Sequence, residues 1–102
     1  MKIGIDAMGG DFAPNEIVKG AIIAQKQLST NESITLFGDK SQILEVIHKE
    51  NASEADFEIV HCSEVIEMGD NPAKAFTKKT DASISVGFRW LAQGKVDGFA
   101  SA

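Results

Sequence analysis

The sequence predicts an α/β fold built on a parallel β-sheet. Short apolar runs rich in β-branched residues alternate along the chain with longer segments whose apolar residues recur at helical spacing. The breaks between these segments are mostly short and contain Gly, Pro, Asp and Asn. Alternation of strands and helices across short breaks is typical of βαβ units with right-handed crossovers. We therefore expect four parallel strands with helices between them.

The composition is that of one ordinary globular domain. The chain has 102 residues, of which 43% are apolar and 25% are charged, and its formal net charge is −5. That charge argues against a general nucleic-acid binder, which needs a basic surface. Cys62 is the only cysteine, which excludes an intrachain disulfide and a cysteine-based zinc site and predicts a reduced, cytoplasmic protein. Asp6 interrupts any amino-terminal signal core, and no apolar run is long enough to span a membrane.

The first predicted unit is a strand followed by a helix. Ile3 and Ile5 lie in a short strand that ends near Asp6 and Ala7. Pro14 suits the first turn of the following helix, where its missing N–H costs nothing. The apolar face of that helix carries Ile17, Val18, Ala21, Ile22 and Leu28.

A second strand and helix follow a polar break. Residues 34–37 are predicted as a strand, which Gly38 closes. Asp39, with Gln42 three positions later, resembles a capping box at the start of a helix. One face of that helix is apolar and carries Ile43, Leu44, Val46 and Ile47.

The second half of the chain predicts two more strands. Residues 57–62 form the third strand, and a longer connection over residues 63–71 follows it. Asn71-Pro72 is a pair typical of a helix cap and first turn, which predicts a short helix. The fourth strand is predicted over residues 96–100.

The helix before the fourth strand is predicted between Asp81, as its cap, and Gly94, which stops it. Its buried face is predicted to carry Ile84, Phe88 and Leu91. Gly87 on that face would permit close approach of the helix to the sheet. Because a parallel sheet needs helices on both faces, a chain that ends on a strand leaves one face poorly covered. We therefore expect residues 1–102 to be the amino-terminal part of a single larger α/β catalytic domain.

Ligands of open parallel sheets bind beyond the carboxyl ends of the strands. Those ends are predicted at residues 6–11, 38–39, 63–70 and 101–102, which are rich in Gly, Asp and Ser. Gly9-Gly10 has two equally supported interpretations, a cradle for an anion and a tight strand-to-helix turn without a ligand. The turn lacks the third glycine of the dinucleotide fingerprint.

Two acidic residues flank this glycine turn. Asp6 and Asp11 could orient a substrate, act as a base or hold a magnesium ion through water. The alternative is that Asp6 caps backbone N–H groups and Asp11 helps to start the helix, and for a metal role we favour this alternative. We therefore predict no metal site.

Lysines and a cysteine supply further candidates. Lys74, Lys78 and Lys79 could bind phosphate or an acidic carrier protein, although Lys74 fits a solvated helix face better. Lys78 and Lys79 precede a helix start that can itself bind an anion. Cys62 adjoins His61, but neighbours in a strand point to opposite faces, so a buried structural thiol is favoured over a catalytic pair.

The chain also resembles a known family. The bacterial phosphate acyltransferase (PlsX) family of phospholipid synthesis has an opening signature similar to Ile3-Gly4-Ile5-Asp6-Ala7-Met8-Gly9-Gly10-Asp11-Phe12-Ala13-Pro14. The resemblance continues along the chain in Val18-Lys19-Gly20-Ala21, in Ser63-Glu64-Val65-Ile66-Glu67-Met68 with Pro72, in Lys79, Ser83 and Val86, and in Ala100-Ser101-Ala102. It departs where many members have two arginines, at Thr77 and Lys78, and where many have two serines, at Ala82 and Ser83.

The resemblance implies a Rossmann-like three-layer fold similar to isocitrate and isopropylmalate dehydrogenases and to phosphotransacetylase. It implies a homodimer that needs no cofactor and transfers a fatty acyl chain from acyl carrier protein to inorganic phosphate. The product would be acyl phosphate for a membrane glycerol-3-phosphate acyltransferase, so the cytoplasmic protein could be peripheral to the inner face of the membrane. The family continues after its Ser-Ala with Gly-Asn-Thr-Gly, so residues 1–102 alone are expected to be inactive.

The resemblance also assigns roles at the carboxyl edge. The catalytic candidates are Asp6, Asp11 and Lys79. The candidates for binding phosphate or substrate are Gly9, Gly10, Lys78, Ser83 and Ser101. The competing hypotheses are a dehydrogenase of the shared fold and a non-catalytic fragment for dimerisation or carrier binding.

Overall fold

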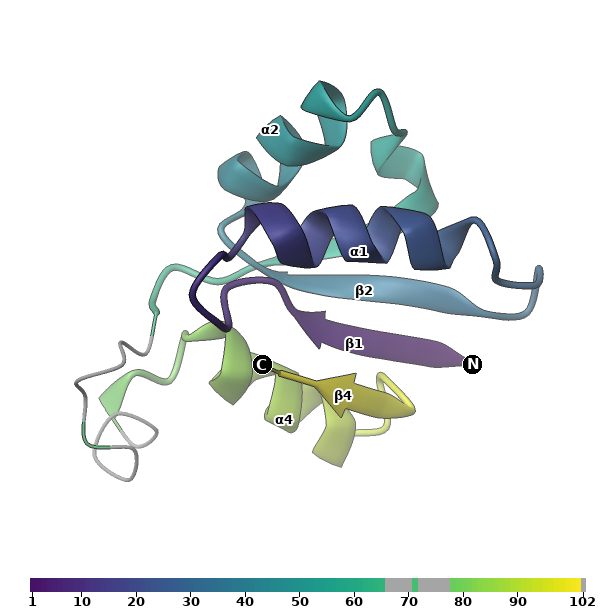
Figure 1. Cartoon of the computed structure of the whole chain (residues 1–102). Coiled ribbons are helices and arrows are strands. Elements are labelled where there is room, and N and C mark those ends of the chain that lie inside the picture. Colours follow the sequence, from purple (N-terminus) through teal and green to yellow (C-terminus); the bar gives the residue numbers. More distant parts are fainter. Residues whose placement is uncertain (66–70, 72–77, 102) are drawn as a thin grey trace.

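A computed structural model describes residues 1–65, 71 and 78–101. In these residues four strands form one parallel sheet: β1 (Lys2–Asp6), β2 (Ser33–Gly38), β3 (Phe57–His61) and β4 (Gly98–Ala100). Their order across the sheet is β3-β2-β1-β4. Figure 1 shows β2, β1 and β4 in this order. The predicted α/β fold with a parallel sheet is confirmed.

Helices cover both faces of the sheet. α1 (Asn15–Gln25) and α2 (Lys40–Lys49) lie on one face, and α4 (Ser83–Ala92) lies on the other (Figure 1). A short 3-10 helix, η1 (Glu54–Asp56), leads into β3. None of the helices in the described residues is long and apolar enough to cross a membrane.

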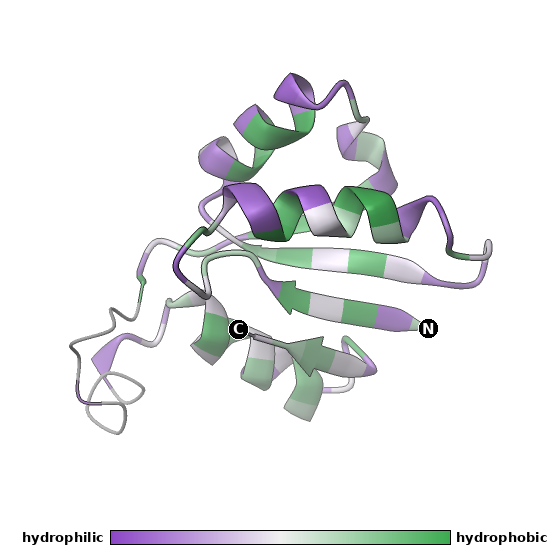
Figure 2. Cartoon of the chain, viewed as in Figure 1, coloured by the Kyte–Doolittle hydropathy of each residue, from purple (hydrophilic) through white to green (hydrophobic). Residues whose placement is uncertain are grey.

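The face under α1 and α2 holds the larger hydrophobic core. Its buried side chains come from both helices, from Ile34 and Leu36 of β2, and from Ala7 and Phe57. The helical contribution is Val18, Ala21, Ile22, Ile43, Val46 and Ile47, in agreement with the predicted apolar faces. The hydropathy colouring shows β2 beneath α1 with alternating hydrophobic and near-neutral bands (Figure 2).

The beginning of α2 also follows the prediction. Asp39 is its N-cap and accepts a hydrogen bond from the Gln42 backbone N–H at 3.2 Å. The Ser41 hydroxyl donates to the same carboxylate oxygen at 2.8 Å. The Ser41 hydroxyl, followed by the Gln42 N–H, lowers the pKa of the Asp39 carboxyl below its ordinary value.

The opposite core lies between the sheet and α4. Phe37, Cys62, Val86 and Val96 are buried there, and Val60, Trp90 and Phe99 pack against them. The Phe37 ring meets Trp90 edge to face, with ring centroids 5.3 Å apart, and meets Phe99 in the same way at 5.6 Å. These aromatic contacts fix α4 against β2 and β4.

The predicted buried face of α4 was wrong. Phe88 is 45% exposed and Leu91 is 36% exposed, whereas the buried residues of the helix are Ser83, Ser85, Val86 and Gly87. The helix is apolar on two adjoining stripes, and the inner stripe is the one that contains the small residues. The predicted close approach at Gly87 is confirmed, because a β-carbon there would overlap the Phe99 ring.

The predicted cap of α4 was also wrong. α4 begins at Ser83 after Ala82, whose side chain offers no acceptor. The Asp81 carboxylate instead accepts hydrogen bonds from Ser63, at 2.8 Å from the backbone N–H and 2.5 Å from the hydroxyl. Gly94 follows the helix with a positive φ of 74°, as a helix stop requires. The short helix predicted at Asn71-Pro72 falls outside the described residues.

Candidate functional site

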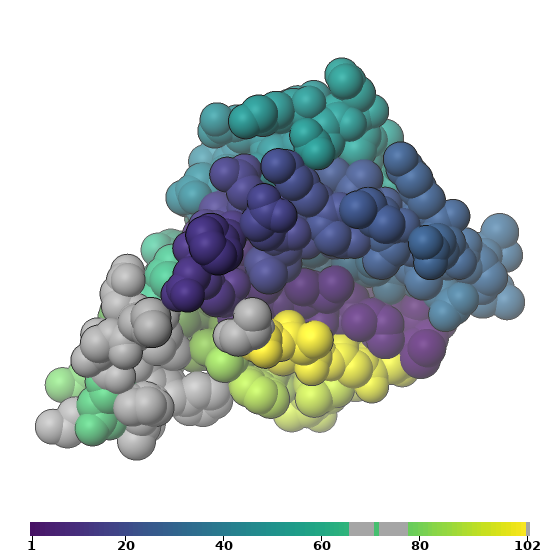
Figure 3. Space-filling model, in the orientation of Figure 1, coloured from purple at the N-terminus to yellow at the C-terminus, as the bar shows by residue number. Residues whose placement is uncertain are grey.

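The sheet order places a topological switch point between β1 and β4. From β1 the chain builds outward through β2 and β3 on one side and then returns to place β4 on the other. Ligands of open parallel sheets bind in the crevice beyond the carboxyl ends of the two strands at such a point. In the register of this pair Ile5 lies opposite Ala100, so Asp6 and Ser101 are the next residues at the carboxyl ends of the two strands, where the rule places the crevice. The two strands lie side by side in the space-filling view (Figure 3).

Asp6 is the centre of a hydrogen-bond cluster at this crevice. Its side chain is only 5% exposed, and both of its oxygens accept hydrogen bonds from protein donors. Oδ1 accepts from the Met8 backbone N–H at 2.9 Å and from the Ser83 hydroxyl at 2.5 Å. Oδ2 accepts from the Ser101 hydroxyl at 2.7 Å. One carboxylate thus joins the turn after β1, the beginning of α4 and the segment after β4.

The turn after β1 begins with residues that contact the sheet, Ala7 and Met8, and continues into exposed residues, Asp11 and Phe12. Ala7 donates its N–H to the Phe37 carbonyl at 2.9 Å, and Met8 packs against Gly38, where a β-carbon would lie 2.8 Å from Met8 Cγ. Gly10 has a positive φ of 88°. Asp11 is exposed and the neighbouring Phe12 is 74% exposed. The predicted capping role of Asp6 is therefore present, while roles of Gly9, Gly10 and Asp11 toward a ligand stay predictions.

Ser83 and Ser101 both reach Asp6, but their surroundings differ. Ser83 is the first residue of α4 and is 4% exposed, whereas Ser101 is exposed. Each of these hydroxyl groups donates its one proton to Asp6. Each serine oxygen can therefore only accept hydrogen bonds from any other partner. Of the two, Ser101 is the one that a ligand can reach.

The segment before α4 is fixed by long-range contacts. Glu64 bridges to Ala82 in a parallel arrangement, and the Asp81 N–H donates to the Glu64 carboxylate at 3.2 Å. The Ser63 hydroxyl, followed by its backbone N–H, lowers the pKa of the Asp81 carboxyl below its ordinary value. These contacts of residues 63–64 with residues 81–82 form a clamp. It was not predicted from the sequence, because Asp81 also stood where a helix cap was expected.

Lys79 lies at this clamp and Lys78 lies outside it. The Lys79 ammonium donates to the Val65 carbonyl at 2.9 Å, and the Lys79 carbonyl accepts from the Ser85 hydroxyl at 3.0 Å. The Lys79 ammonium is thus positioned by the segment that follows β3. Lys78 is exposed. The predicted contacts of both lysines with phosphate stay predictions, and Lys74 falls outside the described residues.

Cys62 does not form a catalytic pair with His61. The Cys62 thiol is buried, and burial, followed by the Asp81 and Asp6 carboxylates, raises its pKa to about 11. The His61 side chain lies on the α2 side, where Nδ1 accepts from the Lys40 backbone N–H at 3.1 Å. A thiol with this pKa carries little thiolate at neutral pH, which agrees with the predicted structural role.

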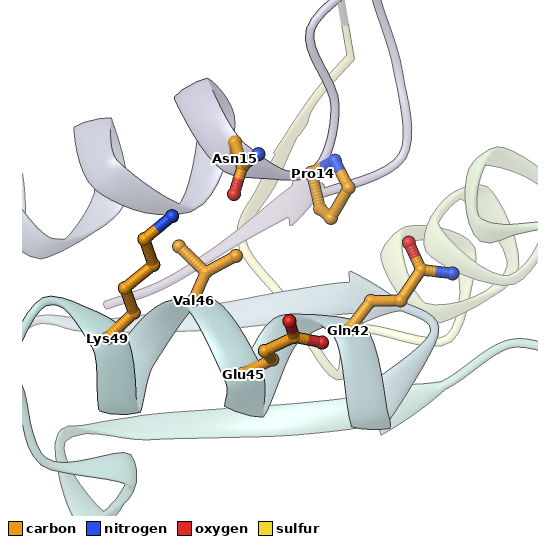
Figure 4. A pocket seen from close by; sticks show the side chains of 6 residues that line it. All are labelled: Pro14, Asn15, Gln42, Glu45, Val46 and Lys49. Carbon is orange, nitrogen blue, oxygen red and sulfur yellow. The ribbon is translucent and has the colours of Figure 1, made fainter.

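A hollow away from this edge of the sheet lies between the beginning of α1 and the side of α2. It encloses about 210 Å³ and is lined by Pro14 and Asn15 from α1 and by Gln42, Glu45, Val46 and Lys49 from α2 (Figure 4). Its lining is mostly polar, and no sequence pattern marks it. In the part of the chain that the structure describes, no three His, Cys, Asp or Glu side chains are grouped as metal ligands would be.

Comparison with known proteins gives one consistent family. A family model described as "Fatty acid synthesis protein" matches residues 1–102. A protein of Dictyoglomus turgidum named phosphate acyltransferase is 46% identical over 102 residues, which are 100% of this chain and 30% of that protein. Proteins of the same name from Caldicellulosiruptor bescii and Oenococcus oeni are 43% and 44% identical, over 100% and 98% of this chain and 30% and 28% of their own lengths. The chain thus spans about three tenths of the length of these relatives.

Proposed function

The chain belongs to the fatty acid synthesis protein family, and we propose on that premise that it forms part of a phosphate acyltransferase. The observation that carries this proposal is its match over its whole length, at 46% identity, to a relative of that name. The proposed reaction transfers a fatty acyl chain from the thioester of acyl carrier protein to inorganic phosphate. The product would be acyl phosphate for phospholipid synthesis.

The chemistry asks for few groups. A phosphate oxygen attacks the thioester carbonyl carbon, the C–S bond breaks, and the thiol of the carrier leaves with the proton that phosphate brought. The protein must hold phosphate beside the carbonyl and stabilise the oxyanion that develops on the carbonyl oxygen. A crevice at a switch point, with backbone N–H groups at the beginning of α4 and a glycine turn beside it, suits that task.

The roles of individual residues follow from their positions. Asp6 holds the crevice together, Ser101 faces it, and Lys79 offers positive charge at the segment before α4. Gly9, Gly10 and Asp11 would form the opposite wall. We further propose that the protein is a cytoplasmic homodimer which meets acyl carrier protein on this edge. Delivery of product to a membrane glycerol-3-phosphate acyltransferase would bring it to the inner face of the membrane.

The proposal is tested by trapping the product. Full-length protein is mixed with acyl carrier protein thioester and phosphate, and hydroxylamine converts any acyl phosphate to a hydroxamate. Because hydroxylamine also reacts with thioesters, the same mixture without phosphate is the control, and a second control omits the protein. We expect hydroxamate that requires both protein and phosphate. Hydroxamate no higher than in the two controls would reject the proposed function.

A further inference from the structure

Asp6 determines which way the Ser101 hydroxyl points. Ser101 Oγ lies 2.7 Å from Asp6 Oδ2, and Asp6 is buried, so its carboxylate is a strong acceptor for this hydroxyl. The hydroxyl proton of Ser101 therefore lies on the line to Asp6. The Ser101 oxygen then has only lone pairs left for a ligand, which accept hydrogen bonds and cannot donate them.

The other contacts of Asp6 keep this arrangement in place. Oδ1 is occupied by the Met8 N–H and by the Ser83 hydroxyl, so the carboxylate cannot turn without losing both bonds. All three of these donors, including the Ser101 hydroxyl, are engaged with Asp6. The contacts of Asp6 with β1, α4 and the segment after β4 therefore keep Ser101 as a hydrogen-bond acceptor toward a ligand.

An acceptor at an anion site has a consequence for selectivity. Inorganic phosphate keeps at least one proton near neutral pH and can donate it, whereas sulfate has no proton to donate. A sulfate oxygen facing the Ser101 lone pairs, with the Asp6 charge behind them, meets only repulsion. When a bound ligand leaves a polar group of the site without a hydrogen-bond partner, binding of that ligand is strongly disfavoured. Loss of a favourable contact alone disfavours it less.

We infer that Asp6 is a positioning residue which holds Ser101 as a hydrogen-bond acceptor and so makes the crevice select protonated phosphate over sulfate. This inference rests on the proposed function, because it takes phosphate as the ligand of the crevice. Phosphate is then held by donors from the backbone and from Lys79, while its own P–O–H group donates to Ser101. The selectivity belongs to the Asp6–Ser101 pair and not to net positive charge.

The test compares phosphate with sulfate in three forms of the full-length protein. The KM for phosphate and the inhibition constant of sulfate are measured for wild type, Asp6→Asn and Ser101→Ala. In Asp6→Asn the amide oxygen can still accept from Met8 and Ser83, but the amide nitrogen donates to Ser101 and frees its proton for the ligand. We expect the selectivity for phosphate over sulfate to fall by roughly tenfold or more.

Ser101→Ala removes one hydroxyl and adds no bulk, and denaturant unfolding of the variant shows whether it still folds. It removes the acceptor, so the KM for phosphate should rise by roughly tenfold while sulfate inhibition stays the same or strengthens. Equal weakening of both anions, or no change in either, would overturn the inference. So would an unchanged selectivity in a folded Asp6→Asn protein.

The outcome for the inference can be told apart from that for the proposed function. If wild type forms no hydroxamate, the acyltransferase proposal fails, and binding of inorganic phosphate and of sulfate is then measured by calorimetry on the same three proteins. Selective phosphate binding in wild type that is lost in both variants would support the inference without any activity. Absence of selectivity in wild type would overturn it.

Discussion

Gly87 of α4 lies against the ring of Phe99 of β4 so closely that a β-carbon on residue 87 would overlap the carbon atoms of that ring. The same ring meets Phe37 and Phe88 edge to face, with centroids 5.6 Å and 5.3 Å away. Phe99 is therefore held on three sides and has little room to move. This contact sets the distance between α4 and the strand that forms one wall of the crevice.

Gly87→Ala should destabilise the protein. The added methyl group would force Phe99 or α4 to shift, and overpacking of this kind costs about 1–3 kcal/mol of unfolding free energy. Gly20→Ala is the matched control, because Gly20 lies within α1 and a β-carbon added there would have no neighbouring atom within 4 Å. There alanine should stabilise the protein by up to about 1 kcal/mol. Denaturant unfolding of both variants measures the difference, and equal stabilisation by both would show that the Phe99 contact yields without strain.

Asp39 should contribute stability that depends on pH. A carboxyl whose pKa is lower in the folded than in the unfolded chain stabilises above its ordinary pKa of about 3.9, and the contribution disappears as the pH falls through the folded value. Asn caps a helix as well as Asp does and cannot titrate. The stability of wild type relative to Asp39→Asn should therefore be constant down to the ordinary carboxyl pKa of about 3.9 and fall as the pH is lowered further, as followed by urea unfolding. A pH-independent difference would contradict the role of the charged cap.

Cys62 should be unreactive and dispensable for activity. With a pKa of about 11 its thiol stays protonated at neutral pH, so a disulfide reagent should label it slowly until the protein is unfolded. Because the folded-state pKa is raised, the folded state holds the proton that the unfolded chain loses first, so stability should fall as the pH rises from about 9 to about 11. Cys62→Ala should remove this fall and keep hydroxamate formation. Loss of activity in a folded Cys62→Ala protein would revive the nucleophile hypothesis.

Lys79→Ala should raise the KM for phosphate. The expected change is roughly tenfold, the size of one lost hydrogen bond to a charged group, with a smaller effect on kcat. Lys19→Ala is the control, since Lys19 lies on α1 in an exposed ion pair with Glu16 at 3.8 Å. Steady-state kinetics with varied phosphate distinguish the two lysines. An unchanged KM would contradict a phosphate contact and leave Lys79 with a structural role.

Much of the fold could be predicted from the sequence, because local patterns decide it. The strands around Ile5 and Leu36 and the helices around Val18 and Ile47 each have one clear period. The position of α4 in the chain was predicted correctly, but the wrong face of the helix was predicted to be buried. Its two apolar stripes have the same helical spacing, so the spacing cannot tell which stripe faces the sheet. Only the packing of Phe99 on Gly87 chooses between them, and that contact is made across the sheet.

The sequence predicted where the residues of the candidate site lie on the sheet, but it did not predict the hydrogen bonds between their side chains. Strand alternation placed Asp6 and Ser101 at the carboxyl edge, but a single sequence contains no signal that their side chains meet. Asp81 illustrates the same limit, because a short acidic residue before a helix is the usual sign of a cap. Its bond to Ser63 depends on a partner 18 residues away.

The position of β1 in the middle of the sheet has a consequence for how the crevice forms. β1 pairs with β2 through a nearby connection, whereas its pairing with β4 joins residues 95 positions apart, as between Lys2 and Asp97. Closing the longer loop costs more chain entropy, so we expect β4 to dock after β1, β2 and β3 have formed a sheet. The crevice would then be the last feature to assemble and the first to open, and amide protons of residues 98–100 should exchange with solvent before those of β2.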